Sequence, residues 1–248
     1  MWAVPRLGCV VHLAVWSGPR NLSTALMYSF ASRGDCAVWD EPFYAAYLAA
    51  TGIDHPMRDE VIAAGECDPQ MVAHACIGPI PGGAPLYYEK HMTLHMIPAF
   101  DRSFMRECVN VFLIRHPVRV VASYTRQRAS VTLDDIGFTQ QANLFDEVAD
   151  FNGHTPVVVD SSDIRADPGS VLSRLCAAVG IEYTERMTRW PAGGHPSDGV
   201  WAPHWYEAVH RSTGFESAEG ALPNLTGAAA DLAALAMPSY ERLRIHAI

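Results

Sequence analysis

The sequence predicts an α/β fold in which one large domain, residues 1–248, is built on an open parallel sheet. The first observation is a short apolar run, residues 12–16, which stops at a polar turn and gives way to a helical pattern. Further strand candidates, residues 36–40, 86–89 and 109–114, also end at charged residues or proline. A hydrophobic content of 49% and a charged content of 18% are typical of a globular chain.

The turn after the first predicted strand has the properties of an anion-binding loop. The apolar run ends at Ser17-Gly18-Pro19, and from Leu22 onward apolar residues recur at helical spacing. A helix therefore begins where the turn ends, and its free backbone N–H groups and positive dipole end attract an anion. Arg20 could bind a phosphate or sulfonate through two parallel hydrogen bonds. The candidate ligand-binding residues of this turn are Ser17, Gly18, Arg20, Asn21, Ser23 and Thr24.

The turn differs from the mononucleotide P-loop, G-x-x-x-x-G-K-[ST]. That motif requires a second glycine and a lysine, which residues 18–24 lack. The ligand is therefore not expected to be ATP with magnesium. At this point an ordinary strand-to-helix turn without a ligand is the alternative, because such turns with Gly and Ser are common.

Composition and charge narrow the choice of partners and of compartment. The net charge of −9 argues against nucleic-acid or membrane-surface binding, so any anion must be bound by a local basic pocket. No apolar run reaches the length of a transmembrane span. The six cysteines lack C-x-x-C pairs and are expected to be free thiols in a reducing compartment. These features predict a cytoplasmic protein.

Charged residues at the ends of two strands are candidates for catalysis. Glu41 follows the predicted strand 36–40 and could be a general base; alternatively, it is a first-turn acid that stabilises the next helix. Asp40 and Glu41 are adjacent, so in a continuing strand only one of them would face the site. Lys90 is the single lysine among 18 Lys and Arg residues, which favours a specific role, although a chance surface lysine is the alternative.

A pair of histidines follows Lys90. His91 and His95 have the i, i+4 spacing of a helical metal pair. However, Met92 stands where a zinc protease has its glutamate, and no third ligand is evident. No metal site is therefore predicted.

A second basic group follows the predicted strand 109–114. Arg115 comes directly after that strand, where a helix is predicted to begin. Arg119, Ser123 and Arg126 would then share one stripe of the helix. The group predicts a second anion site, and the alternative is a solvated basic helix face.

In their order along the chain, these motifs resemble those of the sulfotransferases that use 3′-phosphoadenosine 5′-phosphosulfate (PAPS), in particular the bacterial, small-substrate type. Residues 17–24 are similar to the family's 5′-phosphosulfate loop. IRHPVRVVASY is similar to its 3′-phosphate motif, with Arg115 and Ser123 eight residues apart. Residues 157–180 resemble its later strand, acidic turn and helix. The resemblance implies a three-layer, P-loop-NTPase-like fold, with a central parallel sheet and helices on both faces.

The resemblance also implies which residues bind the donor. Arg20, Ser23 and Thr24 would bind the 5′-phosphosulfate of PAPS. Arg115 and Ser123 would bind its 3′-phosphate. One departure concerns Arg20, because cytosolic relatives carry a lysine at this position of the loop.

The resemblance further implies that Glu41, Lys90 and Arg20 are the catalytic residues and that no metal takes part. Glu41 matches the family's carboxylate base, and Lys90 matches the lysine that steadies the transferring group. Relatives with a histidine base make His91 the alternative to Glu41. The expected reaction is in-line transfer of a sulfonate to a hydroxyl or amine of a small-molecule acceptor. A P-loop-type nucleotide kinase and a nucleotide-binding protein without catalysis are the alternatives.

The predicted domain has a core at about residues 10–182 and two further segments. Residues from about 186 to 215 are rich in Trp, Tyr and His, which predicts either a lid or acceptor wall, or a satellite hydrophobic cluster. Residues from about 226 to 246 predict C-terminal helices interrupted at Pro238.

Overall fold

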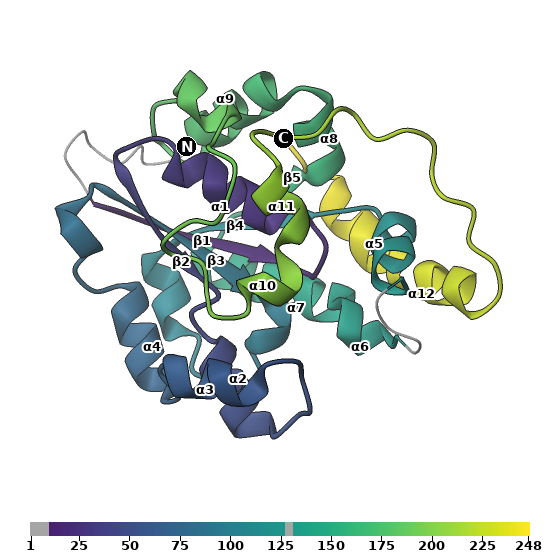
Figure 1. Ribbon diagram of the computed structural model, residues 1–248, viewed down its shortest axis with the longest axis horizontal. Helices are drawn as coiled ribbons and strands as arrows, with labels where there is room; N and C mark the ends of the chain where they lie inside the picture. The colour runs from purple at the N-terminus through teal and green to yellow at the C-terminus, as the bar shows by residue number, and fades with distance from the viewer. Residues whose placement is uncertain (1–9, 127–130) are drawn as a thin grey trace.

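Five parallel strands form the central sheet of the protein (Figure 1). The structure is a computed structural model that describes residues 10–126 and 131–248. The sheet has the order β2-β3-β1-β4-β5. The strands are β1 (Val11–Ser17), β2 (Cys36–Asp40), β3 (Leu86–Met92), β4 (Val109–Ile114) and β5 (Val157–Asp160). The predicted α/β class with a parallel sheet is confirmed.

Helices make up most of the connections between the strands. The α-helices are α1 (Ser23–Ala31), α2 (Tyr44–Thr51), α3 (Arg58–Ala64), α4 (Pro69–Cys76), α5 (Pro117–Tyr124), α6 (Leu133–Ile136), α7 (Phe138–Asn152), α8 (Ser161–Ala166), α9 (Pro168–Ala178), α10 (Ala202–Trp205), α11 (Glu207–Arg211) and α12 (Ala228–Arg244). The 3₁₀ turns are η1 (Pro81–Gly83), η2 (Thr93–His95), η3 (Ser103–Glu107) and η4 (Glu185–Thr188).

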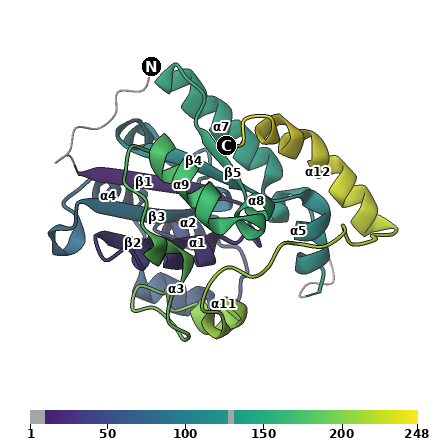
Figure 2. The same cartoon turned by 90° about the horizontal axis from the view of Figure 1, so that it is seen from above.

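Helices cover both faces of the sheet (Figures 1 and 2). On one face, α1, α8 and α9 pack against buried strand residues such as Leu13, Val15 and Leu113. On the other face, α4, α5, α7 and α12 pack against Trp16 and Phe112. Strands covered on both sides are apolar on both faces, which explains the continuous apolar runs in the sequence. The predicted three-layer arrangement is confirmed.

The turn after β1 lies at the topological switch point of the sheet, where the strand order reverses. β1 is between β3 and β4, and Ser17 at its carboxyl end is paired with Met92 and Leu113. The chain first adds β2 and β3 on one side of β1 and then adds β4 and β5 on the other. In open α/β sheets, ligands bind at such a point, outside the carboxyl ends of the strands.

The strand predicted at residues 86–89 is longer than the sequence indicated. It continues to Met92, so Lys90 and His91 lie within β3 and not after it. Successive side chains of a strand point to opposite faces. Lys90 and His91 are therefore directed to different sides of the sheet.

The C-terminal helix is continuous, and the predicted interruption at Pro238 is wrong. α12 runs through Pro238, with Leu232, Ala236 and Tyr240 buried along one side. Pro238 and Ala234, whose carbonyl loses its hydrogen-bond donor, are both exposed, so this break in the hydrogen bonding lies on the solvent side of the helix. Packing against α5 and α7 holds the helix together across this position.

The described cysteines form no disulfide. Five are free, of which Cys76, Cys108 and Cys176 are buried; Cys9 lies outside the described residues. Within residues 10–126 and 131–248, no helix has both the length and the apolar character needed to cross a bilayer.

Candidate active site

A cavity of about 470 Å³ lies at the carboxyl ends of β1 to β4. Its walls combine the turn after β1, the ends of β2 and β3, the α5 region and residues 205–216. The sequence-predicted residues that line it are Arg20, Asn21, Ser23, Thr24, Glu41, Lys90, Arg115 and Ser123. Ser17 and Gly18 do not line it.

The turn between β1 and α1 presents an open helix start to the cavity. Arg20 and Leu22 have positive φ angles, 63° and 72°, which non-glycine residues rarely adopt and which are often found at functional sites. No side chain caps the helix at Leu22, and its first turn carries no acidic residue. The first backbone N–H groups of α1 are therefore available to an anion.

Three of the predicted turn residues hold the turn in place. A Cβ on Gly18 would lie 2.9 Å from the carbonyl oxygen of Ile136, so this position requires glycine. Asn21 Nδ2 donates to the Leu113 carbonyl at 3.2 Å, which fastens the turn to β4. Ser17 is buried, with its Oγ 3.9 Å from Met92 Sδ.

The two predicted anion-binding groups are joined to each other. Arg20 Nε donates to Ser123 Oγ at 2.9 Å, and Arg115 Nη1 donates to the carbonyl oxygen of residue 20 at 2.7 Å. Burial, and then the neighbouring charge of Arg115, lower the pKa of Arg20. No described carboxylate forms an ion pair with Arg20, although Arg115 pairs with Glu219. Two half-buried guanidinium groups at one cavity wall favour an anionic ligand.

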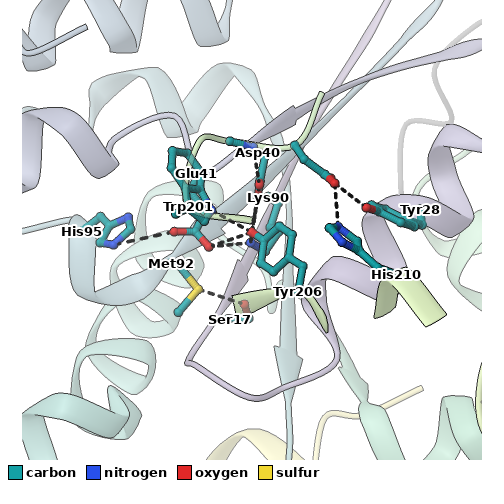
Figure 3. Close-up of polar contacts among 12 residues, drawn as sticks. Ser17, Tyr28, Asp40, Glu41, Lys90, Met92, His95, Trp201, Tyr206 and His210 are labelled. Carbon is teal, nitrogen blue, oxygen red and sulfur yellow. Dashed lines mark hydrogen bonds and ion pairs between the residues drawn. The ribbon is translucent and has the colours of Figure 1, made fainter. Parts of the chain in front are cut away.

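Lys90 also lines the cavity and is buried, with only 1% of its side chain exposed. Figure 3 shows its ammonium between two carboxylates and a phenol. Nζ donates to Asp40 Oδ1 at 2.8 Å, to Glu41 Oε1 at 2.5 Å and to the hydroxyl of Tyr206 at 2.6 Å. The alternative of a chance surface lysine is wrong.

Asp40 and Glu41 meet at the same ammonium, contrary to the expectation that only one could face the site. β2 ends at Asp40, and Glu41 has a φ angle of 47°. This turn of the backbone removes the alternation of a strand, so both side chains are directed to Lys90. The sequence could not show it, because a positive φ is unusual for glutamate.

Residues 11–247 match the family model described as a sulfotransferase domain. The chain belongs to this sulfotransferase family. It is 35% identical over 237 residues to branched-chain-amino-acid aminotransferase-like protein 2 of Arabidopsis thaliana, and 37% identical over 238 residues to the like-named protein 1. Both matches cover 96% of this chain but 42% of the other protein, so the chain spans less than half the length of these relatives.

A solved sulfotransferase domain shares its fold. The domain from the curacin biosynthetic pathway has a TM-score of 0.52 at 15% identity, covering 91% of this chain and 97% of that one. The domain from the Synechococcus PCC 7002 olefin synthase has a TM-score of 0.48 at 15% identity, covering 95% and 98%. Family membership rests on the match to the family model, and it argues against the alternative of a P-loop-type nucleotide kinase.

The charges of the buried network around Lys90 determine the protonation states of its members. Burial opposes the charge of Lys90, but Asp40 and Glu41 outweigh it and raise the pKa of the ammonium. Burial, and then the charge of Asp40, raise the pKa of Tyr206 well above its ordinary value. Tyr206 therefore keeps its proton and donates it to Asp40, at 2.8 Å from Oδ2. The same hydroxyl accepts from Trp201 Nε1 at 2.9 Å.

His95 is a cavity residue whose role was not foreseen from the sequence. Its Nε2 lies 3.9 Å from Glu41 Oε2, and its ring stacks on those of Tyr44 and Tyr47, with centroids 4.5 and 5.0 Å away. Burial, and then the charge of Lys90, lower the pKa of His95 well below its ordinary value, so the ring is neutral. In the sequence, His95 stood out only through its i, i+4 spacing from His91, and that pair was rejected as a metal site.

His91 is not placed to act as the base. Its ring stacks on Trp16 with centroids 4.3 Å apart, and Nε2 is 3.0 Å from Glu89 Oε2. It does not line the cavity, because the side chain points to the other face of β3. Within the described chain, Cys76, Glu89 and His91 lie close enough to hold a metal; all three are buried, and Glu89 Oε2 is the oxygen that faces His91 Nε2.

The aromatic segment after residue 186 contributes to two places. Trp190 packs edge-on against Phe215 in the core cluster of the α1 face. Trp205 and Tyr206 line the cavity. Trp190 thus belongs to a hydrophobic cluster, whereas Trp205 and Tyr206 form part of a cavity wall. The action of the segment as a lid remains a prediction.

His95→Gln should flatten the pH dependence of stability between pH 7.5 and 5. The folded pKa of His95 is below its ordinary value of 6.5, so unfolding takes up a proton below that pH. The stability that neutral His95 provides is present above pH 6.5 and is lost towards lower pH by up to about 1.4 kcal/mol per pH unit. Urea unfolding at several pH values tests this, with His204→Gln, at an exposed position, as the control. Equal pH slopes for His95→Gln and the parent protein would contradict it.

Proposed function

We propose that this sulfotransferase uses PAPS as the sulfonate donor and a hydroxyl or amine of a small molecule as the acceptor. One observation carries the proposal: a single cavity joins a pair of arginines, Arg20 and Arg115, to the carboxylate of Glu41. Sulfonate transfer needs fixed positive charge where the leaving group develops negative charge, and a proton acceptor at the nucleophile.

The donor end of the cavity suits a ligand with two anionic groups. The open start of α1 and Arg20 would bind the 5′-phosphosulfate, with hydroxyl donors from Ser23 and Thr24. Arg115 would bind the 3′-phosphate near Ser123. Because Arg20 bonds to Ser123, both subsites belong to one connected structure.

In the proposed reaction, Glu41 accepts the proton of the acceptor. Its Oε1 is occupied by Lys90, whereas Oε2 faces His95 across the cavity wall. The acceptor oxygen or nitrogen forms a bond to sulfur as the bond from sulfur to the bridging oxygen breaks. The electron pair of that bond goes to the leaving adenosine 3′,5′-bisphosphate, whose charge Arg20 and the start of α1 stabilise.

We assign Lys90 a positioning role in place of the direct contact that the family resemblance implied. An ammonium has three hydrogens, and here Asp40, Glu41 and Tyr206 accept all of them. No donor remains for the transferring sulfonate in this arrangement. Lys90 would instead orient Glu41 and add a positive charge beneath the reacting groups.

The acceptor end of the cavity has an aromatic and aliphatic wall. Tyr44, Leu94 and Trp205 line it next to Glu41. Such a wall favours an acceptor with an apolar body, oriented by a few polar groups. The free cysteines suit a reducing compartment, and we include a cytoplasmic location in the proposal.

Arg20→Asn should lower kcat about tenfold or more while raising the Kd for adenosine 3′,5′-bisphosphate by less than about threefold. Asparagine tolerates the positive φ of this position, and the carbonyl that binds Arg115 is retained. The lost charge acts mainly on the leaving group. Turnover assays and isothermal titration measure the two effects, and abolished nucleotide binding by a folded variant would contradict this division of roles.

Thermal unfolding with two nucleotides tests the proposed donor. Adenosine 3′,5′-bisphosphate at 100 times its Kd should raise the Tm by about 5 °C or more, because it binds the folded state only. ADP with magnesium should raise it less. A larger shift with ADP and magnesium would contradict the choice of PAPS.

A further inference from the structure

The chain's own Glu219 occupies an arginine cluster beside the proposed 3′-phosphate subsite. Its carboxylate forms ion pairs with Arg115, with Arg119 Nε at 2.9 Å and with Arg165 Nη1 at 3.0 Å. Only 4% of the Glu219 side chain is exposed. A carboxylate among three guanidinium groups, with Arg126 nearby, stands where an anion is expected to bind.

Glu219 belongs to a connecting segment, residues 215–226, which contains neither helix nor strand. Figure 2 shows this segment running from α11 to α12 past α5. The same arginines also hold its backbone: Arg165 Nε donates to the Ser217 carbonyl at 3.0 Å, and Arg119 donates to the Gly220 carbonyl. The arginine cluster therefore holds the middle of the segment, residues 217–220, whereas Phe215 and Leu225 near its ends pack against the hydrophobic core.

The carboxylate of Glu219 does not satisfy all the hydrogen-bond donors of the arginine cluster. Arg115 Nε is buried and has no hydrogen-bond partner within the described chain. The cluster lines a hollow of about 300 Å³ that continues from the main cavity, sharing Arg115 and Ser123 with it. A phosphate monoester carries nearly two negative charges and three acceptor oxygens, and so matches several arginines better than one carboxylate does.

We propose that Glu219 is an internal occupant of the 3′-phosphate subsite, which the nucleotide must displace, and that Arg119 and Arg165 then join Arg115 in binding the phosphate. This inference rests on the proposed use of PAPS. A nucleotide with a 3′-phosphate would release the connecting segment from the cluster. A nucleotide that carries only a 5′-phosphate would leave Glu219 in place.

Competition of this kind has a measurable effect on affinity. The apparent Kd of a ligand rises in proportion as the competent state of its site becomes rarer. Glu219→Gln removes the competing charge without changing the side-chain size. It should tighten binding of adenosine 3′,5′-bisphosphate by about tenfold and change binding of adenosine 5′-phosphate by less than about twofold.

Isothermal titration of both nucleotides against the parent protein and Glu219→Gln tests the proposal. Glu147→Gln is the matched control, because it alters another carboxylate paired with an arginine, Arg102, outside the cluster. It should leave both affinities unchanged. Weaker or equal binding of the bisphosphate by Glu219→Gln would overturn the proposal.

Amide hydrogen exchange on the parent protein provides a second readout that needs no variant. Residues 216–222 should exchange faster with the bisphosphate bound than with adenosine 5′-phosphate bound. Slower exchange there would show that the segment stays in place, and would overturn the displacement of Glu219. If instead neither protein bound the bisphosphate but both bound ADP with magnesium, the proposed donor itself would be wrong, and this inference would fail with it.

Discussion

Glu41→Gln should lower kcat by about 10²-fold or more, with the Kd for adenosine 3′,5′-bisphosphate changed by less than about threefold. Glutamine keeps the size of the side chain and can still accept from Lys90, so the buried network survives. It cannot take up the acceptor's proton. The loss should therefore appear in turnover and not in donor binding or in Tm.

A matched variant distinguishes Glu41 from its neighbour His95. The neutral ring of His95 is 3.9 Å from Glu41 Oε2 and could relay or replace the base. His95→Gln should lower kcat less than Glu41→Gln does. If His95→Gln abolished turnover while Glu41→Gln retained it on the natural acceptor, the base would be His95.

Lys90→Met should both destabilise the fold and lower turnover. Removing the ammonium leaves Asp40, which is fully buried, and Glu41 without their cation, which should cost about 3 kcal/mol or more of stability. It also releases Glu41 from its fixed position, so kcat should fall by about 10²-fold. Urea unfolding and turnover assays measure the two losses separately.

The double variant Lys90→Met with Asp40→Asn separates these two effects. Neutralising Asp40 removes an uncompensated buried charge, so stability should be partly restored. Turnover should stay low, because Glu41 still lacks its partner. Recovery of turnover in the double variant would show that Lys90 has no part in positioning the base. Asp40→Asn alone should also destabilise the protein, because buried Lys90 then loses one of its two carboxylate partners.

The positions of the residues that we propose to bind the donor could be predicted from the sequence, because they depend on local features. A strand that ends at a polar turn places Arg20 at a helix start, and the same rule places Arg115 after β4. The order of these motifs indicated the family before any geometry was available. The links between them, from Arg20 to Ser123 and from Arg115 to the carbonyl oxygen of residue 20, required the structure.

The contacts around the proposed base, and the Glu219 contact beside the proposed 3′-phosphate subsite, could not be predicted in the same way, because they join distant segments of the chain. Tyr206 reaches Lys90 across 116 residues of chain, and Glu219 reaches Arg115 across 104. The positive φ of Glu41 brings two adjacent carboxylates together, which no periodic pattern encodes. Because β3 extends to Met92, beyond the predicted end at residue 89, His91 points away from the cavity, whereas His95 lines it near Glu41.

Isothermal titration of Arg115→Ala tests the central claim, that this cavity binds a nucleotide through its 3′-phosphate, most directly. The parent protein should bind adenosine 3′,5′-bisphosphate more tightly than adenosine 5′-phosphate. Arg115→Ala should weaken binding of the bisphosphate by about tenfold or more and barely affect the monophosphate. Arg242→Ala, which removes an exposed arginine paired with Asp146, should change neither affinity. Equal losses for both nucleotides in Arg115→Ala, or no preference for the bisphosphate in the parent protein, would contradict the claim.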